Sequence, residues 1–299
     1  MTVAQPQVHT VGVLGAGTMG HGIAQVAAAA GFQVVLRDVD QAAVDRGQQS
    51  IERNLAKGIE RGKVTEQQRD ETLARIAITT ELRDLAAADL IIEAAPENLG
   101  LKQDLLRECE ALTDSSCVWA TNTSSLAITE IASAASRPEK VIGMHFFNPV
   151  HIMKLVEIVV GQRTGDKTTA IVRQVASHMK KEPIVVRDVP GFASSRLGVT
   201  LGLEAMRMVE QGVASARDID TAMELGYNHP MGPLRLTDLV GLDVRLHIAE
   251  YLHGKLGSET FRPPEILRRM VDEGKLGKKT GQGFYDWTDS DKTQMARTS

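Results

Sequence analysis

The chain is poor in the features that mark several classes of protein. Its 299 residues include only two cysteines, Cys109 and Cys117, whose spacing fits neither a disulfide framework nor a cysteine metal site. The formal net charge is −4, which provides no basic surface for nucleic acid. No apolar run is long enough to span a bilayer, and residues 1–10 lack the basic and apolar segments of a secretory signal. We therefore expect a cytoplasmic protein with reduced thiols and no metal, membrane or nucleic-acid partner.

The most informative pattern in the sequence lies near the N-terminus. A β-rich run, residues 11–14, is followed by the sequence GAGTMG at residues 15–20. In a strand–turn–helix unit, Gly15 permits the tight turn and Gly17 lets the backbone approach a pyrophosphate. Gly20 lets the helix pack closely on the strand. This arrangement predicts a dinucleotide-binding turn, whereas the simpler interpretation is a structural turn without a ligand.

The residues around this turn indicate which dinucleotide is bound. Thr18 and Met19 lie where a helix begins, and its unpaired N–H groups favour phosphate. Asp38 follows a second strand, eighteen residues after the turn, where an acid accepts hydrogen bonds from the adenosine ribose. The neighbouring Arg37 is a residue type that can accommodate a 2′-phosphate, but adjacent strand residues point in opposite directions. We therefore expect NAD as the cofactor.

The pattern along the chain predicts two domains. Up to residue 188 strands and helices alternate, which predicts an α/β fold with a Rossmann-type, doubly wound, mostly parallel sheet. A helical hairpin over about residues 40–76 is larger than a simple crossover needs. From residue 189 onward strand signals cease, so residues 189–299 are expected to form an all-helical C-terminal domain. Its expected helices cover residues 193–211, 215–225, 234–256 and 264–273.

Polar residues follow the expected strands where a ligand would bind. Residues 120–125 offer hydroxyls and an amide, and His145 and Asn148 follow another strand. Glu157 lies in an otherwise apolar strand, where a buried carboxylate would need a partner. Together His145 and Glu157 suggest a proton acceptor held by a carboxylate. The spacing leaves open that Glu157 faces solvent from an edge strand and that His145 is an ordinary polar residue.

Several longer stretches carry a resemblance to a known family. The sequence resembles the 3-hydroxyacyl-CoA dehydrogenase family, and most closely its short, stand-alone members that act on 3-hydroxybutyryl-CoA. A histidine in HFFNP followed twelve residues later by a glutamate is specific to this family. The matching stretches are GAGTMGHGIA (15–24), EAAPENLGLK (93–102), TNTSSLAIT (121–129), GMHFFNPVHIMKLVEIV (143–159), VPGF (189–192), HPMGPLRLTDLVGLD (229–243) and KKTGQGFYDW (278–287).

The resemblance implies a role for each catalytic candidate. His145 would be the general base that takes the proton of the 3-hydroxyl while hydride passes to the nicotinamide. Glu157 would orient His145. Ser124 and Asn148 would contact the reacting oxygen and the thioester region of the substrate.

The resemblance also implies binding residues. Glu97 and Lys102 would line the cofactor site, and Lys57 in the helical hairpin would face the phosphates of CoA. One departure occurs at Ser195, next to Arg196, where many family members have an asparagine. A serine is shorter and offers one hydroxyl in place of an amide, so its direct contact with substrate is in doubt.

The expected function follows from these implied roles. It is NAD-dependent (S)-3-hydroxyacyl-CoA dehydrogenase activity on short substrates such as acetoacetyl-CoA and 3-hydroxybutyryl-CoA, in a homodimer formed through the C-terminal domain. Two alternatives remain, a related dehydrogenase of free hydroxy acids or sugar acids and a non-catalytic dinucleotide-binding protein.

Overall fold

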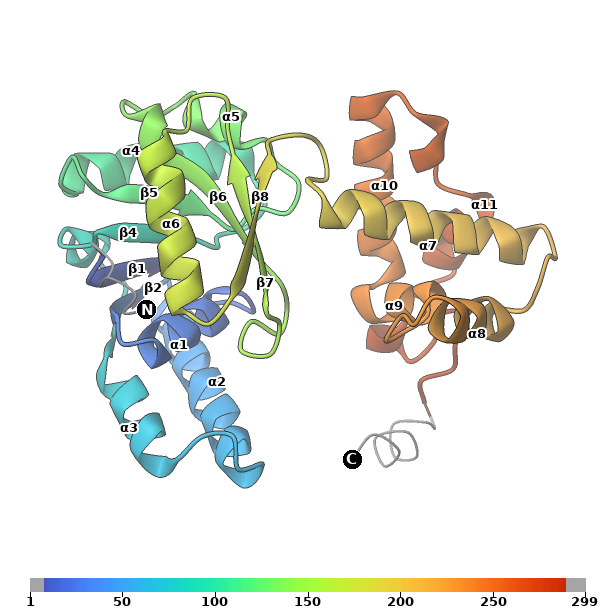
Figure 1. Ribbon diagram of the computed structural model, residues 1–299, viewed down its shortest axis with the longest axis horizontal. Helices are drawn as coiled ribbons and strands as arrows, with labels where there is room; N and C mark the ends of the chain where they lie inside the picture. The colour runs from blue at the N-terminus through green and yellow to red at the C-terminus, as the bar shows by residue number, and fades with distance from the viewer. Residues whose placement is uncertain (1–7, 289–299) are drawn as a thin grey trace. The chain divides into compact units, whose positions relative to one another are not determined.

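The computed structural model describes residues 8–288. The chain divides into two compact units, the first ending at Phe192 and the second beginning at Ala193. Each unit is described by itself below (Figure 1). No helix within the described residues is long and apolar enough to cross a membrane.

The first unit is built on an eight-stranded sheet with the order β3-β2-β1-β4-β5-β6-β7-β8. Strands β1 to β6 run parallel, β7 runs antiparallel to β6, and β8 runs parallel to β7. This confirms the predicted doubly wound, mostly parallel sheet. The strands are β1 (Thr10–Leu14), β2 (Gln33–Arg37), β3 (Ile76–Thr79), β4 (Leu90–Glu93), β5 (Val118–Thr121), β6 (Val141–Phe146), β7 (Leu155–Val160) and β8 (Glu182–Arg187).

Helices cover both faces of this sheet because its strands are apolar on both sides. In β4, for example, Leu90 and Ile92 join one buried cluster and Ile91 joins the other. The first cluster includes residues of α1, α2 and α6, and the second includes residues of α4 and α5. The helices are α1 (Gly20–Ala29), α2 (Gln41–Glu60), α3 (Glu66–Ala74), α4 (Leu99–Leu112), α5 (Ile128–Ala132) and α6 (Asp166–His178), with 3-10 turns η1 (Leu82–Leu85) and η2 (Pro138–Lys140).

Helices α2 and α3 form a two-helix arm, which extends beyond the sheet (Figure 1). The Asp40 side chain accepts a hydrogen bond from the backbone of residue 42 and starts α2. Thr65 and Gln68 form a capping box at the start of α3. Buried Ile51 and Leu55 of α2 belong to the same apolar cluster as α1, so the arm is anchored on the helix that follows the glycine turn.

The second unit is helical, as predicted, and its described segments form no strand beyond isolated bridges near residues 277–286. The prediction of one helix over residues 234–256 is wrong. Gly241 has φ +104°, a backbone conformation that ends the helix, so two helices form where the sequence suggested one. The helices are α7 (Ser194–Glu210), α8 (Ala216–Gly226), α9 (Pro233–Val240), α10 (Leu242–Leu256) and α11 (Glu265–Asp272), with 3-10 turns η3 (Glu259–Phe261) and η4 (Lys278–Thr280).

A buried aspartate fastens the last described segment to this unit. Asp238 of α9 is 1% exposed and accepts hydrogen bonds from the backbone N–H groups of Phe284 and Tyr285, at 2.9 Å each. It also accepts one from the indole N–H of Trp287, at 2.8 Å. Three donors therefore depend on one carboxylate.

We expect Asp238→Ala to lower the free energy of unfolding by about 3 kcal/mol, because it leaves these buried donors without an acceptor. Urea unfolding followed by circular dichroism measures the change. Asp272→Ala, at an exposed position of α11, is the control and should change the stability by less than about 0.5 kcal/mol. Equal stability of the two variants would contradict the role of Asp238.

Candidate active site

The glycine turn after β1 has no room for a side chain at two of its three glycines, Gly15 and Gly20. A Cβ atom on Gly20 would lie 1.7 Å from the carbonyl oxygen of Gly15, and Gly15 itself has φ +95°. The closest neighbour of Gly20 is therefore the turn itself, and Val13 of β1 comes next, 3.6 Å from the same Cβ position. A Cβ on Gly17 would meet nothing within 4 Å. Gly17 and Thr18 are exposed, so the backbone at the start of α1 is open to a ligand, as a pyrophosphate requires.

Asp38 is fixed beside this turn. Its carboxylate accepts hydrogen bonds from the backbone N–H groups of Ala16 and Val39, each at 2.7 Å. A cavity of about 250 Å³ lies next to it, lined by residues of the glycine turn, α1 and α2. The guanidinium of Arg37 donates to the carbonyl oxygen of Thr80 at 3.1 Å. The acid therefore borders the expected ribose position, while Arg37 is bound to the end of β3.

A buried ion pair lies at the end of β4. Glu93 is fully buried, and its carboxylate accepts hydrogen bonds from Lys102 at 2.7 Å and from the Thr121 hydroxyl at 2.6 Å. The backbone N–H of Ala95 donates to the same carboxylate at 2.6 Å. Lys102 is only 1% exposed and lies 3.4 Å from Glu97. Lys102 is therefore enclosed by the protein, whereas the Glu97 side chain is 36% exposed; contact of either residue with a cofactor stays a prediction.

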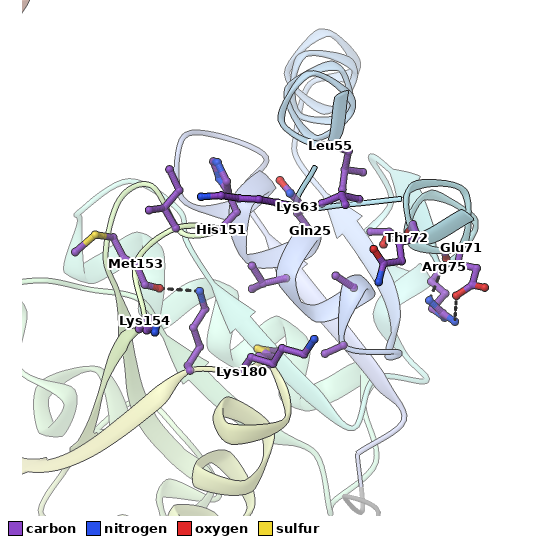
Figure 2. A pocket seen from close by; sticks show the side chains of 18 residues that line it. Gln25, Leu55, Lys63, Glu71, Thr72, Arg75, His151, Met153, Lys154 and Lys180 are labelled. Atoms are coloured by element: carbon purple, nitrogen blue, oxygen red, sulfur yellow. Dashed lines mark hydrogen bonds and ion pairs between the residues drawn. The ribbon is translucent and has the colours of Figure 1, made fainter. Parts of the chain in front are cut away.

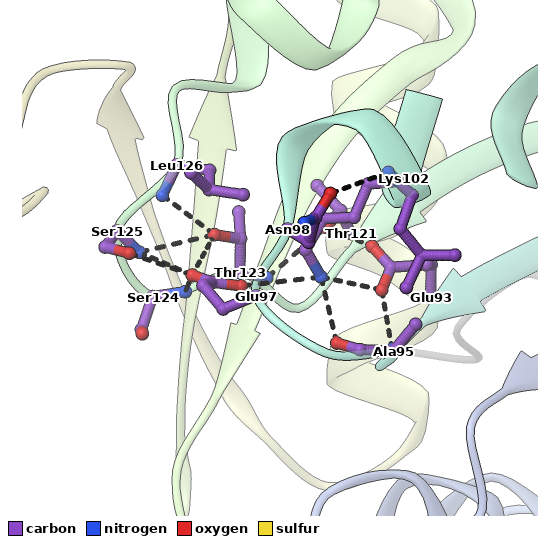
Figure 3. Close-up of polar contacts among 11 residues, drawn as sticks. Glu93, Ala95, Glu97, Asn98, Lys102, Thr121, Thr123, Ser124, Ser125 and Leu126 are labelled. Atoms are coloured by element: carbon purple, nitrogen blue, oxygen red, sulfur yellow. Dashed lines mark hydrogen bonds and ion pairs between the residues drawn. The ribbon is translucent and has the colours of Figure 1, made fainter. Parts of the chain in front are cut away.

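Glu97 organises the loop that follows β5 (Figure 3). One of its carboxylate oxygens accepts hydrogen bonds from the Thr123 hydroxyl at 2.5 Å and the Ser125 hydroxyl at 2.9 Å. The backbone N–H groups of Ser124 and Ser125 donate to the same oxygen, at 3.1 Å each. Burial opposes ionisation of Glu97, but the Lys102 charge and these hydrogen bonds outweigh it and lower the pKa.

The Ser124 side chain points away from Glu97 in Figure 3, so its hydroxyl is not used by this network. A neighbouring residue joins the loop to β6: the Asn122 side-chain oxygen accepts a hydrogen bond from the Phe146 N–H at 2.9 Å. The loop that bears Ser124 is thereby tied to the strand that bears His145.

His145 and Glu157 face each other across β6 and β7. The antiparallel register pairs them directly, and His145 Nδ1 lies 2.8 Å from Glu157 Oε2. Glu157 is fully buried and His145 is 7% exposed. The alternative in which Glu157 faces solvent from an edge strand does not hold, because β8 pairs with the far side of β7.

This hydrogen bond assigns the histidine tautomer. A carboxylate is an acceptor, so in the neutral ring Nδ1 carries the proton and Nε2 carries the lone pair. The His145 ring contacts the rings of Phe147 and Phe192, with centroids 4.6 and 5.9 Å away. Asn148 is exposed three residues after His145. The pair can therefore accept a proton through Nε2 and stabilise the resulting imidazolium.

A buried lysine holds the loop that follows β6. Lys181 is 8% exposed, and its ammonium donates to the backbone carbonyl oxygens of Val150 and Met153, the latter at 2.8 Å. Val150 in turn lies against α1, because a Cβ on Gly22 would come within 2.8 Å of its side chain. The loop containing Asn148 is thus fixed between α1 and the end of α6.

Basic residues gather around a second cavity of the first unit (Figure 2). It measures about 380 Å³ and lies among α1, the two-helix arm, the loop after β6 and the start of β8. Burial lowers the pKa of His151 at its edge, and the nearby basic groups, including Arg61 and Lys57, lower it further. Lys57 is exposed on α2 and does not line the cavity. The basic residues that line it are Lys63, Arg75, His151, Lys154, Lys180 and Lys181.

Some of these residues could not be found by the sequence analysis. Glu93 is an acid in an otherwise apolar strand. The same signal indicated Glu157, so Glu93 could have been predicted as well. Asn122 and Lys181 carry no sequence signal because their partners are backbone groups. Ser195 lies in the first turn of α7 and is half-buried. It belongs to the second unit, whereas the other predicted site residues belong to the first.

Comparison with known proteins agrees with this geometry. Residues 10–189 match the family description "3-hydroxyacyl-CoA dehydrogenase, NAD binding domain", and residues 191–287 match the C-terminal domain of the same family. A protein of Deinococcus radiodurans named "Probable 3-hydroxybutyryl-CoA dehydrogenase" is 47% identical over 92% of this chain and 99% of its own length. The 3-hydroxybutyryl-CoA dehydrogenase of Clostridioides difficile is 44% identical over 92% of this chain and 98% of its own.

A solved structure is also similar over almost the whole chain. The (S)-3-hydroxybutyryl-CoA dehydrogenase of Ralstonia eutropha superposes with a TM-score of 0.91 at 42% identity. The match covers 94% of this chain and 100% of that one. With both domains matched in order and an NAD-binding domain around the glycine turn, the chain belongs to the 3-hydroxyacyl-CoA dehydrogenase family.

Proposed function

We propose that this chain oxidises the 3-hydroxyl of short (S)-3-hydroxyacyl-CoA thioesters and catalyses the reverse reduction, with 3-hydroxybutyryl-CoA and acetoacetyl-CoA as substrates. The observation that carries the proposal is the buried His145–Glu157 pair at 2.8 Å. It lies at the end of β6 in a sheet whose first turn suits a dinucleotide. A histidine with a free Nε2 at this place is suited to remove a proton from an alcohol.

The residues around the glycine turn fit NAD. The open backbone at Gly17 and Thr18 suits the pyrophosphate, and the fixed carboxylate of Asp38 suits the ribose hydroxyls. When bound, NAD supplies the acceptor for the hydride that leaves C3 of the substrate. The chain's own task is to hold the substrate and to remove the hydroxyl proton.

In this mechanism His145 takes the hydroxyl proton on Nε2 as the C3 carbonyl forms. The imidazolium is stabilised by Glu157, whose carboxylate stays within hydrogen-bond distance of Nδ1. Ser124 and Asn148 would donate hydrogen bonds to the reacting oxygen and the thioester region. In the reverse direction the same His145 returns its proton to the alkoxide.

The basic groups of the first unit support a CoA thioester rather than a free acid. CoA carries several phosphate charges. Burial lowers the pKa of His151, and the charges of His21, Lys181, Arg61 and Lys57 lower it further, which shows that basic groups of the arm and of the segment before β8 surround this residue. An anion bound among them would relieve this repulsion. We place the phosphates of CoA here, next to the cavity of Figure 2.

Two further features belong to the proposal. Exposed apolar side chains on the second unit are suited to contact a second copy, which supports a homodimer through the C-terminal domain. They are Leu197, Leu236, Leu239, Val240 and Val244. Cys109 and Cys117 are buried free thiols, in keeping with the reducing conditions of the cytoplasm.

The first test is the rate of NADH oxidation by the purified protein with acetoacetyl-CoA, with free acetoacetate and NADPH measured beside it. We expect turnover of the thioester with NADH and far slower reaction in the other two assays. Turnover of free acetoacetate at a similar kcat/KM would move the assignment to free hydroxy acids. Tight NADH binding without turnover of any thioester would indicate a non-catalytic protein.

Glu157→Gln should lower kcat by roughly 10²-fold or more, because the imidazolium loses its carboxylate and an amide can donate to Nδ1 and reverse the tautomer. In the oxidation direction the acid limb of the pH–rate profile should move to lower pH. His145→Gln removes the base altogether and is the reference; we expect its kcat to be about 10²–10⁴-fold lower than that of the wild type. An unaltered pH profile in Glu157→Gln would show that this carboxylate does not affect proton transfer by His145.

The double variant Lys57→Ala/Arg61→Ala should raise the KM for acetoacetyl-CoA by about 3- to 10-fold with little change in kcat, because exposed charge contacts contribute modestly. Acetoacetyl-pantetheine, which lacks the nucleotide, should show no such difference. Arg163→Ala/Lys167→Ala, which removes the same charges from another exposed site of this unit, is the matched control. An equal KM increase for both thioesters would place the phosphates elsewhere.

A further inference from the structure

The cavity of Figure 2 is not used by the proposed function. Of the described residues that line it, none belongs to the His145–Glu157 pair or to the cavity beside Asp38. Lys57 and Arg61, where we place the phosphates of CoA, do not line it either. Its volume of about 380 Å³ falls within the range of small-molecule sites, about 300–1,000 Å³. A ligand other than the substrate and the cofactor could therefore occupy it.

Much of the lining of this cavity is aliphatic. Helix α1, the arm and the end of α6 each contribute apolar side chains. His151 is the one residue with a ring among the described lining residues, so a nucleobase would find little to stack on. The lining therefore suits an aliphatic chain better than an aromatic group. The aliphatic residues include Val26, Ala29, Ala30, Leu55, Val64 and Met179.

The rest of the lining has an excess of positive charge. Lys63, Lys154 and Lys180 are exposed and form no ion pair with any residue that the structure describes. Glu71, the acid among the described lining residues, lies 3.7 Å from Arg75 and is therefore already paired. Figure 2 shows Lys63 and Lys180 on opposite sides of the cavity. The unpaired charges favour an anionic ligand.

A buried ammonium group adds to this charge. Lys181 is 8% exposed, and its ammonium donates to the backbone carbonyl oxygens of Val150 and Met153. An ammonium has three N–H donors, so one is left for a ligand. Within residues 8–288 no carboxylate pairs with Lys181, and burial lowers its pKa. A buried cation without a counter-charge is stabilised by a bound anion.

Lys180 has a backbone conformation that is unusual for lysine. Its φ is +58° just after the end of α6. Glycine or asparagine is the usual residue in this left-handed conformation at the end of a helix. The chain therefore has a charged side chain at the edge of the cavity where an uncharged residue would suit the backbone better, which supports a use for the charge.

We infer that this cavity binds a free aliphatic carboxylate of medium chain length, such as decanoate. The aliphatic residues contact the chain, Lys181 donates to the carboxylate, and the exposed lysines attract it. An aliphatic alcohol would leave the lysines without an anion, and inorganic phosphate would leave the aliphatic residues uncovered. The inference goes beyond the proposed function and does not require it, because the residues that form the cavity have no part in that reaction.

The test is isothermal titration calorimetry of the purified full-length protein with decanoate. We expect saturable binding at one site per chain. Butyrate should bind more than about 10-fold more weakly, because it buries fewer methylene groups. Decyltrimethylammonium has the same chain and the opposite charge, and should show no saturable binding. Absence of saturable decanoate binding, or equal binding of the cation, overturns the inference.

The double variant Lys63→Ala/Lys180→Asn should raise the Kd for decanoate by about 3- to 10-fold, because two exposed charges are removed. Asparagine suits the left-handed conformation at residue 180, so this variant should fold. Arg163→Ala/Lys167→Ala removes two charges from another exposed site of the same unit and is the matched control. Its Kd should equal that of the wild type. Equal Kd values for all three proteins would contradict the inference.

A second variant tests the position of the chain. Ala29 is exposed on α1 and lines the cavity, so Ala29→Phe should fill it without disturbing the apolar core. We expect this variant to lose saturable binding of decanoate. Ala56→Phe, at an exposed position of α2 outside the cavity, is the control and should bind as the wild type does. Unchanged binding by Ala29→Phe would place decanoate elsewhere and refute the inference.

The titration with decanoate is repeated in the presence of saturating CoA, because the CoA phosphates are placed next to the cavity. Decanoate should still bind. Its displacement by CoA would assign the cavity to the CoA site and overturn the inference, while the proposed function stands. Decanoate binding that meets these expectations in a protein without turnover of acetoacetyl-CoA would instead refute the proposed function and support the inference.

Discussion

The antiparallel pairing of β7 with β6 is the constraint on which the candidate active site depends. It sets His145 directly opposite Glu157 in the register. A shift of one residue would move the glutamate to the other face of the sheet. Because β8 pairs with the far edge of β7 and Glu157 is fully buried, its carboxylate needs hydrogen-bonding partners inside the protein. The pairing of β6, β7 and β8 therefore also determines that His145 and Glu157 form a hydrogen bond.

Around this pair, buried charged side chains hold the loops in place, whereas apolar contacts hold the rest of the sheet. Glu93 and Lys102 form an ion pair beneath the loops at the carboxyl ends of β4 and β5, and Lys181 fixes the loop after β6. Each charge has several hydrogen-bonding partners, as burial demands. Arg245 in the second unit is different, since its Nε is buried without a hydrogen-bond acceptor among the described residues.

Much of this architecture could be predicted from the sequence because it depends on local patterns. The glycine turn, the spacing to Asp38 and the alternation of strands and helices each follow from short-range periodicity. The capping box at Thr65 is likewise a local signal.

The rest depends on contacts between distant residues or on a single backbone angle. Nothing local shows that the ammonium of Lys102 would lie 2.7 Å from the carboxylate of Glu93. The break between α9 and α10 lies at Gly241, whose φ is +104°. The apolar pattern of residues 234–256 continues through Gly241, and a glycine at this position is compatible with one long helix or with two shorter ones. The role of Ser195 is carried by the family resemblance and by no geometric observation of its own.

The loop at residues 123–125 has a consequence for how the site responds to acidity. It has no regular secondary structure, and four hydrogen bonds to one oxygen of Glu97 hold it in place. The order of this loop therefore depends on whether Glu97 is ionised. The pKa of Glu97 is lowered in the folded chain, so this anchoring is complete above the pKa of a free glutamate and is lost as pH falls through the lowered value. The loop that carries Ser124 would loosen in acid while the apolar sheet beneath it stays intact.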